Sequence, residues 1–143
     1  MIRKRIPHIK SVMTPFPYSI QIDDSLAQAA KLMKEHDIHH LPVTDGRELV
    51  GIVTERDINA HLSPKQNSEQ SAVKEVYISN VYIVDLDTPL DNVLMKMAEK
   101  HVGSVLVTKK DRLAGLFTQT DACKCFGTYL REQFTTPGGN DAA

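Results

Sequence analysis

Two heptapeptides decide the fold of this chain: GIVTERD at residues 51–57 and GLFTQTD at residues 115–121. Both read G-x-x-T-x-x-D, in which an apolar run typical of a strand leads into a polar stretch that begins a helix. The copies lie 64 residues apart, and the whole segment 12–57 aligns with 76–121 at that offset without a gap. Identical residues occupy 12 of the 46 aligned positions. The chain therefore contains one supersecondary unit twice.

Each unit begins with a predicted strand followed by a predicted helix. The strands are expected at 18–22 and at 82–86. Asp24 marks the helix start in the first unit, and Thr88 followed by Pro89 marks it in the second, as a capping residue and a proline at the first helical position. The i, i+3, i+4, i+7 spacing predicts one buried stripe on each helix, namely Leu26, Ala29, Ala30 and Met33 in the first and Leu90, Val93, Leu94 and Met97 in the second.

A hairpin and a second helix complete each unit. In the first unit two apolar runs, 38–43 and 49–53, flank Asp45-Gly46, a pair that favours a tight turn between antiparallel strands. The second unit repeats this arrangement. A helix is then expected to begin near Glu55 in one unit and near Gln119 in the other, which gives the order β-α-β-β-α.

We therefore expect a mixed α/β fold of two pseudo-symmetric repeats. The repeats are assigned to 8–62 and 73–131, with a polar connection at 63–72 and a disordered tail at 132–143. A unit of about 46 residues hides too little of its surface to be stable alone, so the two should pack into one module. A cleft at a twofold junction would then occur twice.

Composition narrows the classes of function. The 143 residues include 17 basic and 18 acidic side chains, and a formal charge of −1 argues against a dedicated nucleic-acid binder. No apolar run approaches the roughly 18 residues that a membrane span needs, and the first ten residues hold no signal-peptide core. We therefore expect a cytoplasmic protein without a membrane partner. The two cysteines, Cys123 and Cys125, are too close together to make a disulfide framework.

The duplicated T-x-x-D motifs are the candidate ligand sites. The carboxylates of Asp57 and Asp121 can each accept both hydroxyls of a ribose, while the hydroxyls of Thr54 and Thr118 and free helix N–H groups suit a ribose or phosphate oxygen. The same spacing is also that of a helix capping box. Either motif in isolation is typical of capping, and both roles can coexist.

The repeat pattern resembles a tandem pair of CBS domains, also called a Bateman module, from Ile9 to Leu130. The matching pieces are Val12-Met-Thr-Pro15, the segment IHHLPVTD at 38–45, and the two G-x-x-T-x-x-D motifs. The resemblance implies a regulatory module that requires no cofactor and binds an adenosine-containing ligand such as AMP, ADP, ATP, S-adenosylmethionine or NAD. It also implies a homodimer shaped as a flat disc.

The resemblance further implies that the motif of one repeat faces the first strand of the other. One cleft then combines Thr54 and Asp57 with Asn80, Val81 and Tyr82, and the other combines Thr118 and Asp121 with Phe16, Pro17 and Tyr18. The two tyrosines either lie beside adenine or belong to the core.

The basic candidates come from one repeat only. His39 and His40 resemble a His-Arg pair that contacts phosphates in the regulatory gamma subunit of AMP-activated kinase, and histidine in the second place predicts weaker or pH-dependent phosphate binding. Arg56 is either a further phosphate contact or a solvated surface residue. The second repeat has Gly103 and Ser104 in place of the pair. We therefore expect cations near the first motif and two chemically unequal clefts.

The primary interpretation is a stand-alone, non-enzymatic adenine-nucleotide sensor that acts in trans on an unidentified protein. The alternative is a structural dimerisation module with vestigial clefts. An enzyme is disfavoured, because no nucleophile–base pair recurs with the needed spacing. A metal site at His36, His39 and His40 is also disfavoured, because no carboxylate or cysteine completes a known ligand spacing.

Overall fold

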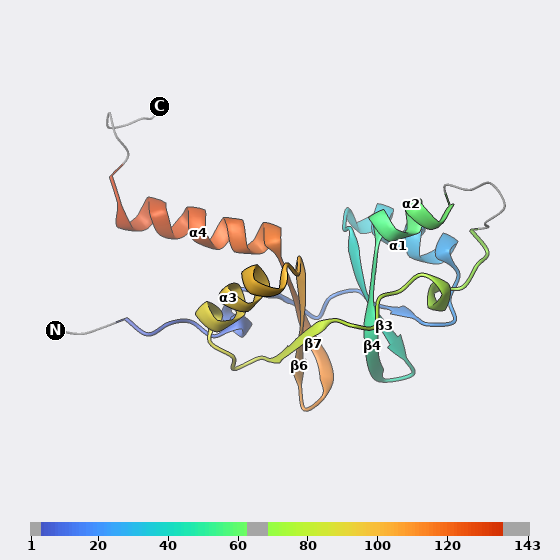
Figure 1. Ribbon diagram of the computed structural model, residues 1–143, viewed down its shortest axis with the longest axis horizontal. Coiled ribbons are helices and arrows are strands. Elements are labelled where there is room, and N and C mark those ends of the chain that lie inside the picture. Colours follow the sequence, from blue (N-terminus) through green and yellow to red (C-terminus); the bar gives the residue numbers. More distant parts are fainter. Residues whose placement is uncertain (1–3, 63–68, 136–143) are drawn as a thin grey trace.

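Both repeats fold in the predicted order of elements. A computed structural model describes residues 4–62 and 69–135 (Figure 1). The first repeat comprises β2 (Ile20–Gln21), α1 (Leu26–His36), β3 (His40–Asp45), β4 (Glu48–Thr54) and α2 (Glu55–Leu62). The second comprises β5 (Tyr82–Asp85), α3 (Leu90–Lys100), β6 (Ser104–Lys109), β7 (Arg112–Thr118) and α4 (Gln119–Gln133). The mixed α/β class and the two repeats are confirmed.

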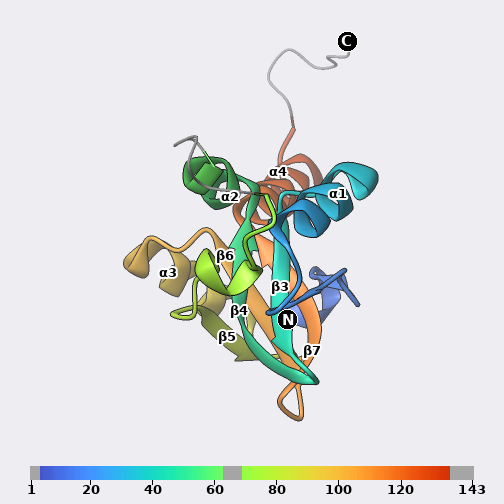
Figure 2. The same ribbon diagram turned by 90° about the vertical axis from the view of Figure 1, so that its right-hand side faces the viewer.

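The strands form one sheet for each repeat. In the first sheet, of order β2-β3-β4, β2 runs parallel to β3 and the β3–β4 hairpin is antiparallel. In the second, of order β1-β7-β6-β5, an additional short strand, β1 (Thr14–Pro15), extends the equivalent arrangement. Figure 2 shows α1, α2 and α4 gathered at one end of these strands, opposite the hairpin tips.

The opening segment of each repeat packs on the other repeat. β1 lies in the opening segment of the first repeat but pairs with β7, with Thr14 opposite Leu116. The equivalent residue Ile78 lies in the opening segment of the second repeat and forms a bridge with Ile52 of β4. The opening segments are therefore exchanged about the pseudo-twofold axis.

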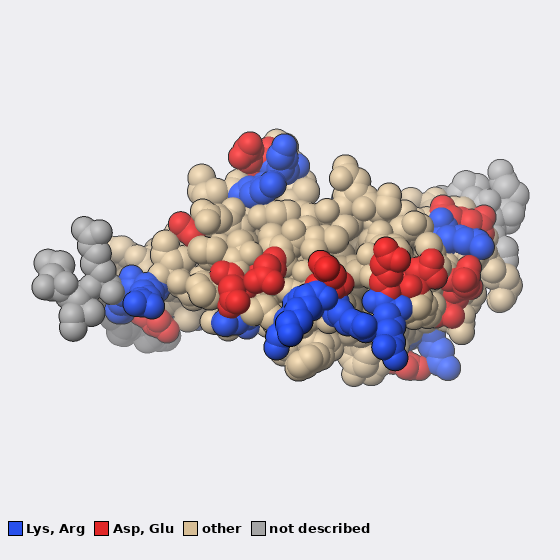
Figure 3. All heavy atoms as spheres, turned by 90° about the horizontal axis from the view of Figure 1, so that it is seen from below, with Lys and Arg blue, Asp and Glu red and all other residues tan. Residues whose placement is uncertain are grey.

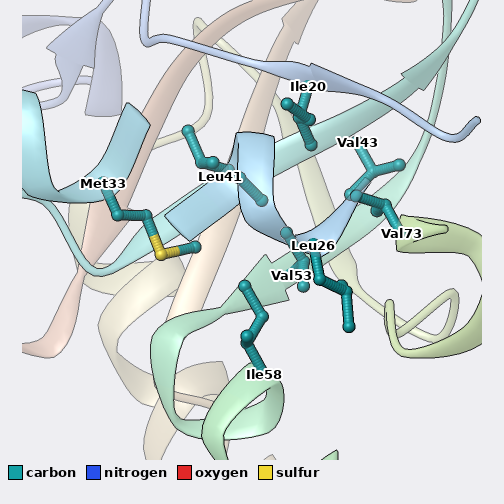
Figure 4. Close-up of a cluster of buried hydrophobic side chains, with 9 residues drawn as sticks. Ile20, Leu26, Met33, Leu41, Val43, Val53, Ile58 and Val73 are labelled. Atoms are coloured by element: carbon teal, nitrogen blue, oxygen red, sulfur yellow. The ribbon is translucent and has the colours of Figure 1, made fainter. Parts of the chain in front are cut away.

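The exchange completes both hydrophobic cores. Figure 4 shows the first core, in which Val73 of the exchanged segment joins side chains of the first repeat, among them Ile20, Leu26, Met33, Leu41, Val43, Val53 and Ile58. Ile9 enters the second core in the same way. A third cluster, of Ile52, Leu106 and Leu116, connects the two sheets. Neither repeat has a complete core without residues that lie outside its own β-α-β-β-α unit.

Several local predictions were wrong in detail. Ser25, not Asp24, caps α1, because its Oγ accepts the Gln28 N–H at 3.1 Å while Gln28 Oε1 accepts the Ser25 N–H at 2.8 Å. Pro89 holds the cap position of α3 itself, with φ −61° and ψ 136°, so the helix starts one residue later. Ala30 is exposed, and the buried stripe of α1 is therefore narrower than its apolar spacing predicted.

The last helix differs most between the repeats. α4 has 15 residues where α2 has 8, and none of its side chains is fully buried. It continues to Gln133, two residues into the predicted tail. The rest of that tail from 136, and the part of the predicted connection at 63–68, lie outside the described residues.

The described surface carries charges of both signs. Figure 3 shows acidic and basic side chains interspersed on one face of the molecule. Within residues 4–62 and 69–135, no helix combines the length and the apolar character that a membrane span needs.

Candidate functional site

The two T-x-x-D motifs lie at equivalent strand-to-helix junctions, where β4 meets α2 and β7 meets α4. Thr54 Oγ1 donates to Asp57 Oδ2 at 2.7 Å and accepts the Asp57 N–H at 3.1 Å. In the second repeat, Thr118 donates to Asp121 Oδ2 through both its N–H, at 2.9 Å, and its Oγ1, at 3.1 Å. Both motifs are therefore helix caps.

Capping engages only one oxygen of each carboxylate. Every described hydrogen bond to Asp57 or Asp121 ends on Oδ2 or on the backbone N–H, and no bond to either Oδ1 is found within the described chain. Both aspartates are half-buried. Each can therefore hold its helix start and still offer an acceptor to a ligand hydroxyl.

Another segment of the chain passes close to the backbone of each motif glycine. A Cβ on Gly51 would collide with the carbonyl oxygen of Ile78 and with the Tyr77 ring. A Cβ on Gly115 would collide with the Met13 side chain. Glycine is needed here because the exchanged segments cross the strands that lead to the two motifs.

The first-strand residues of the second repeat have three different environments. Val81 is half-buried against the cluster that joins the two sheets, and Asn80 is exposed. Tyr82 packs partly in the second core, where burial raises the pKa of its hydroxyl, and Lys96 Nζ lies 5.1 Å from its ring centroid. Tyr82 thus has a structural role of its own.

The corresponding residues of the first repeat are more exposed. Phe16 is 89% exposed, adopts a left-handed φ of 47°, and donates its N–H to the carbonyl oxygen of Ala114 in β7 at 3.0 Å. Pro17 is half-buried. Tyr18 does not belong to the core, since it is 51% exposed and its ring stacks on His36 at 3.8 Å. Left-handed backbone on an aromatic residue is strained, and such strain is concentrated at functional sites.

Two of the basic candidates lie on the surface. His39 Nδ1 and Glu55 Oε1 are 3.1 Å apart, so the neighbouring carboxylate already holds this imidazole. Arg56 is exposed on the first turn of α2. Glu55 was not predicted as a site residue, although its position in the motif, directly before Arg56, placed it next to a predicted phosphate contact.

His40 has a different setting. It begins β3 opposite Thr54 and is half-buried. Burial, together with the charge of His39, lowers the pKa of His40, while the carboxylates of Asp121 and Asp57 oppose this shift. The strand register therefore places His40 beside the first motif, while the charge of Asp121 in the second motif also acts on the pKa of its imidazole.

An apolar groove lies away from both motifs. It has a volume of about 720 Å³ and is lined by the opening segment, α3 and α4, including Ile6, Leu94, Cys125, Phe126 and Tyr129. Burial raises the pKa of the Cys125 thiol, which disfavours its reactive thiolate form. This groove was not predicted from the sequence, although the uninterrupted helical stretch 119–133 indicates a long final helix.

A comparison with known protein families assigns the chain to one of them. The family model of the CBS domain matches residues 9–63 and 73–127. The chain belongs to the CBS-domain family, and the predicted resemblance is confirmed.

Solved structures agree with this assignment. The structure of a CBS domain pair in complex with 5′-methylthioadenosine and S-adenosyl-L-methionine is 30% identical, covers 87% of this chain and 99% of its own, and superposes with a TM-score of 0.76. A putative acetoin utilization protein from Vibrio cholerae is 26% identical, with 92% and 100% coverage and a TM-score of 0.78. The pair of repeats is thus a known architecture, and one of its members binds adenosine ligands.

Curated relatives differ widely in length. L-aspartate semialdehyde sulfurtransferase of Methanocaldococcus jannaschii is 30% identical over 88% of this chain, but the match spans only 24% of that protein. The chain spans between about a quarter and two fifths of the first three relatives. By contrast, Hypoxic response protein 1 of Mycobacterium tuberculosis is 31% identical, with 78% of this chain and 79% of that protein covered.

A metal appears in the name of one related structure. Hypoxic Response Protein I was solved with two coordinated zinc ions, at 29% identity and a TM-score of 0.71. In residues 4–62 and 69–135 of the present chain, no group of three or more His, Cys, Asp or Glu side chains is placed to hold a metal ion.

Proposed function

We propose that this protein is a regulatory module that binds adenosine-containing ligands in two clefts, one at each T-x-x-D motif. The observation that carries the proposal is the divided use of each aspartate, in which Oδ2 caps a helix and Oδ1 stays available. A related CBS pair that binds S-adenosyl-L-methionine and 5′-methylthioadenosine supports the ligand class. AMP, ADP, ATP and NAD are candidates of the same class.

The proposed role of each residue follows from its position. Asp57 and Asp121 accept ribose hydroxyls, and Thr54 and Thr118 hold those carboxylates in place. Asn80, Val81 and Tyr82 flank the base in one cleft, and Phe16, Pro17 and Tyr18 flank it in the other. His39, His40 and Arg56 are the candidates for phosphate.

Thermal unfolding in the presence of adenosine compounds tests this proposal. A ligand at about 100 times its Kd adds roughly 2.7 kcal/mol to the free energy of unfolding, which corresponds to a rise of about 5–10 °C in Tm for a chain of this size. The absence of any shift with AMP, ATP, S-adenosylmethionine or adenosine at millimolar concentration would contradict ligand binding.

A conservative variant separates capping from ligand binding. Glutamate still completes a capping box but places its carboxylate further from the backbone. The double variant Asp57→Glu, Asp121→Glu is therefore expected to keep most of its stability without ligand and to lose most of the ligand-induced shift. Unchanged ligand binding by this variant would remove the aspartates from the site.

We further propose that the module is non-enzymatic and acts in trans, with its ligand state changing its association with a separate protein. Hypoxic response protein 1 supports this role, because the match to the present chain covers 79% of that relative. A structural module with vestigial clefts is the second candidate. Turnover of a bound nucleotide, measured by chromatography of the products, would contradict the non-enzymatic role.

The apolar face of α4 favours self-association, and we propose a homodimer on it. Phe126, Tyr129, Leu130 and Phe134 are all at least 40% exposed, beside the groove against α3. Exposed apolar surface of this kind marks interaction sites, and twofold closure is the commonest assembly.

Light scattering of Phe126→Glu tests the dimer. The wild type is expected at twice the mass of the chain, and the variant at the mass of one chain with ligand binding retained. Asn59→Glu adds the same charge to the exposed surface of α2 and is the matched control. A wild type that is monomeric at high concentration would contradict the dimer.

A further inference from the structure

Gly127 lies in the middle of α4, where its own chain does not require a glycine. Among the glycines of the described residues only Gly46 has a positive φ, so the backbone at Gly127 suits any residue type. A Cβ at Gly127 would have open space around it, whereas a Cβ at Gly51 or Gly115 would collide with a crossing segment. Glycine in a helix interior is less favourable than alanine. The packing within the described chain therefore gives no reason for this glycine.

Exposed apolar side chains surround Gly127 on one side of α4. Cys123, Phe126, Leu130 and Phe134 are all exposed, and their spacing of three, four and four residues places them along one side of the helix. This outer stripe extends over about 17 Å of the helix axis. Figure 1 shows α4 along the outer edge of the second repeat, next to α3.

The outer stripe carries no charge. The charged residues of α4 beyond its first turn are Lys124, Arg131 and Glu132. At about 100° of rotation per residue, each of them lies roughly a quarter turn or more from the centre of the stripe. In a twofold pair each stripe meets its own copy, so a charge on it would approach a like charge. An uncharged stripe avoids this repulsion and is therefore suited to a second copy of the chain.

Gly127 turns part of the stripe into a socket. Cys123, Phe126, Gly127 and Leu130 stand at positions i, i+3, i+4 and i+7, which together form the hole for one side chain of a facing helix. Because one corner of this hole has no side chain, a large residue can enter it and the two helices can approach closely. Phe126, Leu130 and Phe134 are exposed residues of that size. The stripe thus supplies both the socket and the side chains that fit it.

We propose that α4 of a second copy docks on the outer stripe, so that an apolar side chain of each copy enters the Gly127 socket of the other. This inference rests on the proposed homodimer and names the residue at which the two helices cross. The first repeat offers no equivalent contact within its described residues, because α2 ends at Leu62, the counterpart of Phe126. The contact therefore joins the two second repeats.

Gly127→Ala tests the socket, because it should change assembly and chain stability in opposite directions. The added methyl group fills the socket, so the dissociation constant of the dimer, measured by sedimentation equilibrium of the full chain, should rise about tenfold. In the Phe126→Glu background, which the proposed homodimer predicts to be monomeric, Gly127→Ala should instead raise Tm by about 2–4 °C, since alanine favours the helix. Gly127→Leu should leave a monomer at concentrations where the wild type is a dimer.

Thr128→Ala is the matched control. Thr128 is exposed and directly follows Gly127, but it lies about 100° further round the helix, away from the outer stripe. Alanine is the better helix former at this position too. The dissociation constant of Thr128→Ala should therefore stay within about twofold of the wild-type value, a change smaller than a few tenths of the effect expected at Gly127.

The outcomes separate the socket from the homodimer. A dimeric wild type with an equally tight Gly127→Ala variant overturns the socket and leaves the proposed homodimer intact. Equal weakening by Gly127→Ala and Thr128→Ala also overturns the socket, because the effect would then not be specific to the outer stripe. A monomeric wild type leaves the stripe to a different protein and overturns the homodimer and the socket together.

Discussion

The two repeats share a backbone plan but use it differently. Equivalent strand-to-helix junctions carry the same T-x-x-D cap. The equivalent helices α1 and α3 both end at a residue with left-handed backbone conformation, Asp37 in α1 and His101 in α3. Against this common frame the first repeat has His40 where the second has Ser104, and a short α2 where the second has a long, exposed α4. The local structure of the two repeats is therefore equivalent at the caps and helix ends, whereas the residue that begins the hairpin and the length of the last helix differ.

The largest expected difference between the repeats concerns the motif glycines. Gly51→Ala should cost more than about 3 kcal/mol or prevent folding, because the new methyl group meets a backbone carbonyl that cannot move alone. Gly115→Ala should cost about 1–2 kcal/mol, because a flexible Met13 side chain can shift. Urea unfolding of both variants measures the difference.

A second substitution sharpens this comparison. Met13→Ala should relieve the strain of Gly115→Ala, so the double variant should cost less than the sum of the two single changes. Equal costs for the two glycine variants would show that the crossings of the exchanged segments are equivalent.

The exchanged segments provide the next test. Ile9 is fully buried in the core of the second repeat, so Ile9→Ala should lower the free energy of unfolding by about 2–4 kcal/mol. Val73→Ala removes less volume from the first core and should cost about 1–2 kcal/mol. Thermal or urea unfolding followed at the tyrosines gives both values.

The same exchange predicts the behaviour of fragments. Residues 1–66 lack Val73, and their own opening segment would have no second core to enter. The fragment should therefore fail to fold alone. A well-dispersed NMR spectrum of this fragment as a monomer would contradict a cooperative module.

The two hairpin turns should show smaller changes in stability, of opposite sign in the two repeats. Gly46 adopts φ 63° in the first hairpin, whereas Lys110 holds φ 51° at the equivalent place in the second. A left-handed residue with a side chain is strained by roughly 1 kcal/mol relative to glycine. Lys110→Gly should therefore raise the free energy of unfolding by up to about 1 kcal/mol, and Gly46→Lys should lower it by a similar amount. A loss of stability in Lys110→Gly would mean that unfolded-chain entropy outweighs the strain.

The smallest expected effect is the pH dependence of the protein without ligand. Because the pKa of His40 is lower in the folded chain, the unfolded chain binds this proton more readily. The contribution to stability is present above about pH 6.5 and is lost as the pH falls through the folded pKa. Between pH 7.5 and 5.5, His40→Ser should thus lose less stability than the wild type, while a neutral change at Ser104 such as Ser104→Ala should leave the wild-type loss unchanged. Equal losses in His40→Ser and the wild type would show that His40 does not titrate differently on folding.

The predictable part of the site consisted of local features. The capping hydrogen bonds of Thr54 and Thr118 span three residues, and short-range geometry of this kind is encoded directly in the sequence. The stacking of Tyr18 on His36 and the influence of Asp121 on His40 were not predictable in this way, because they join residues that are distant in the chain or belong to different repeats.

The sequence by itself determined the repeat, the order of its elements and the family. Periodicity and spacing are properties of the chain, and two copies at one offset of 64 residues reinforce each other. Only the tertiary structure decided that Ile9 completes the second core and Val73 the first, because exchange or retention of an opening segment satisfies the same apolar pattern. Tertiary structure also decided that α4 leaves an apolar face uncovered and that His40 is within the influence of both motif carboxylates. Such placements depend on how the two sheets pack, and packing depends on contacts between residues far apart in the chain.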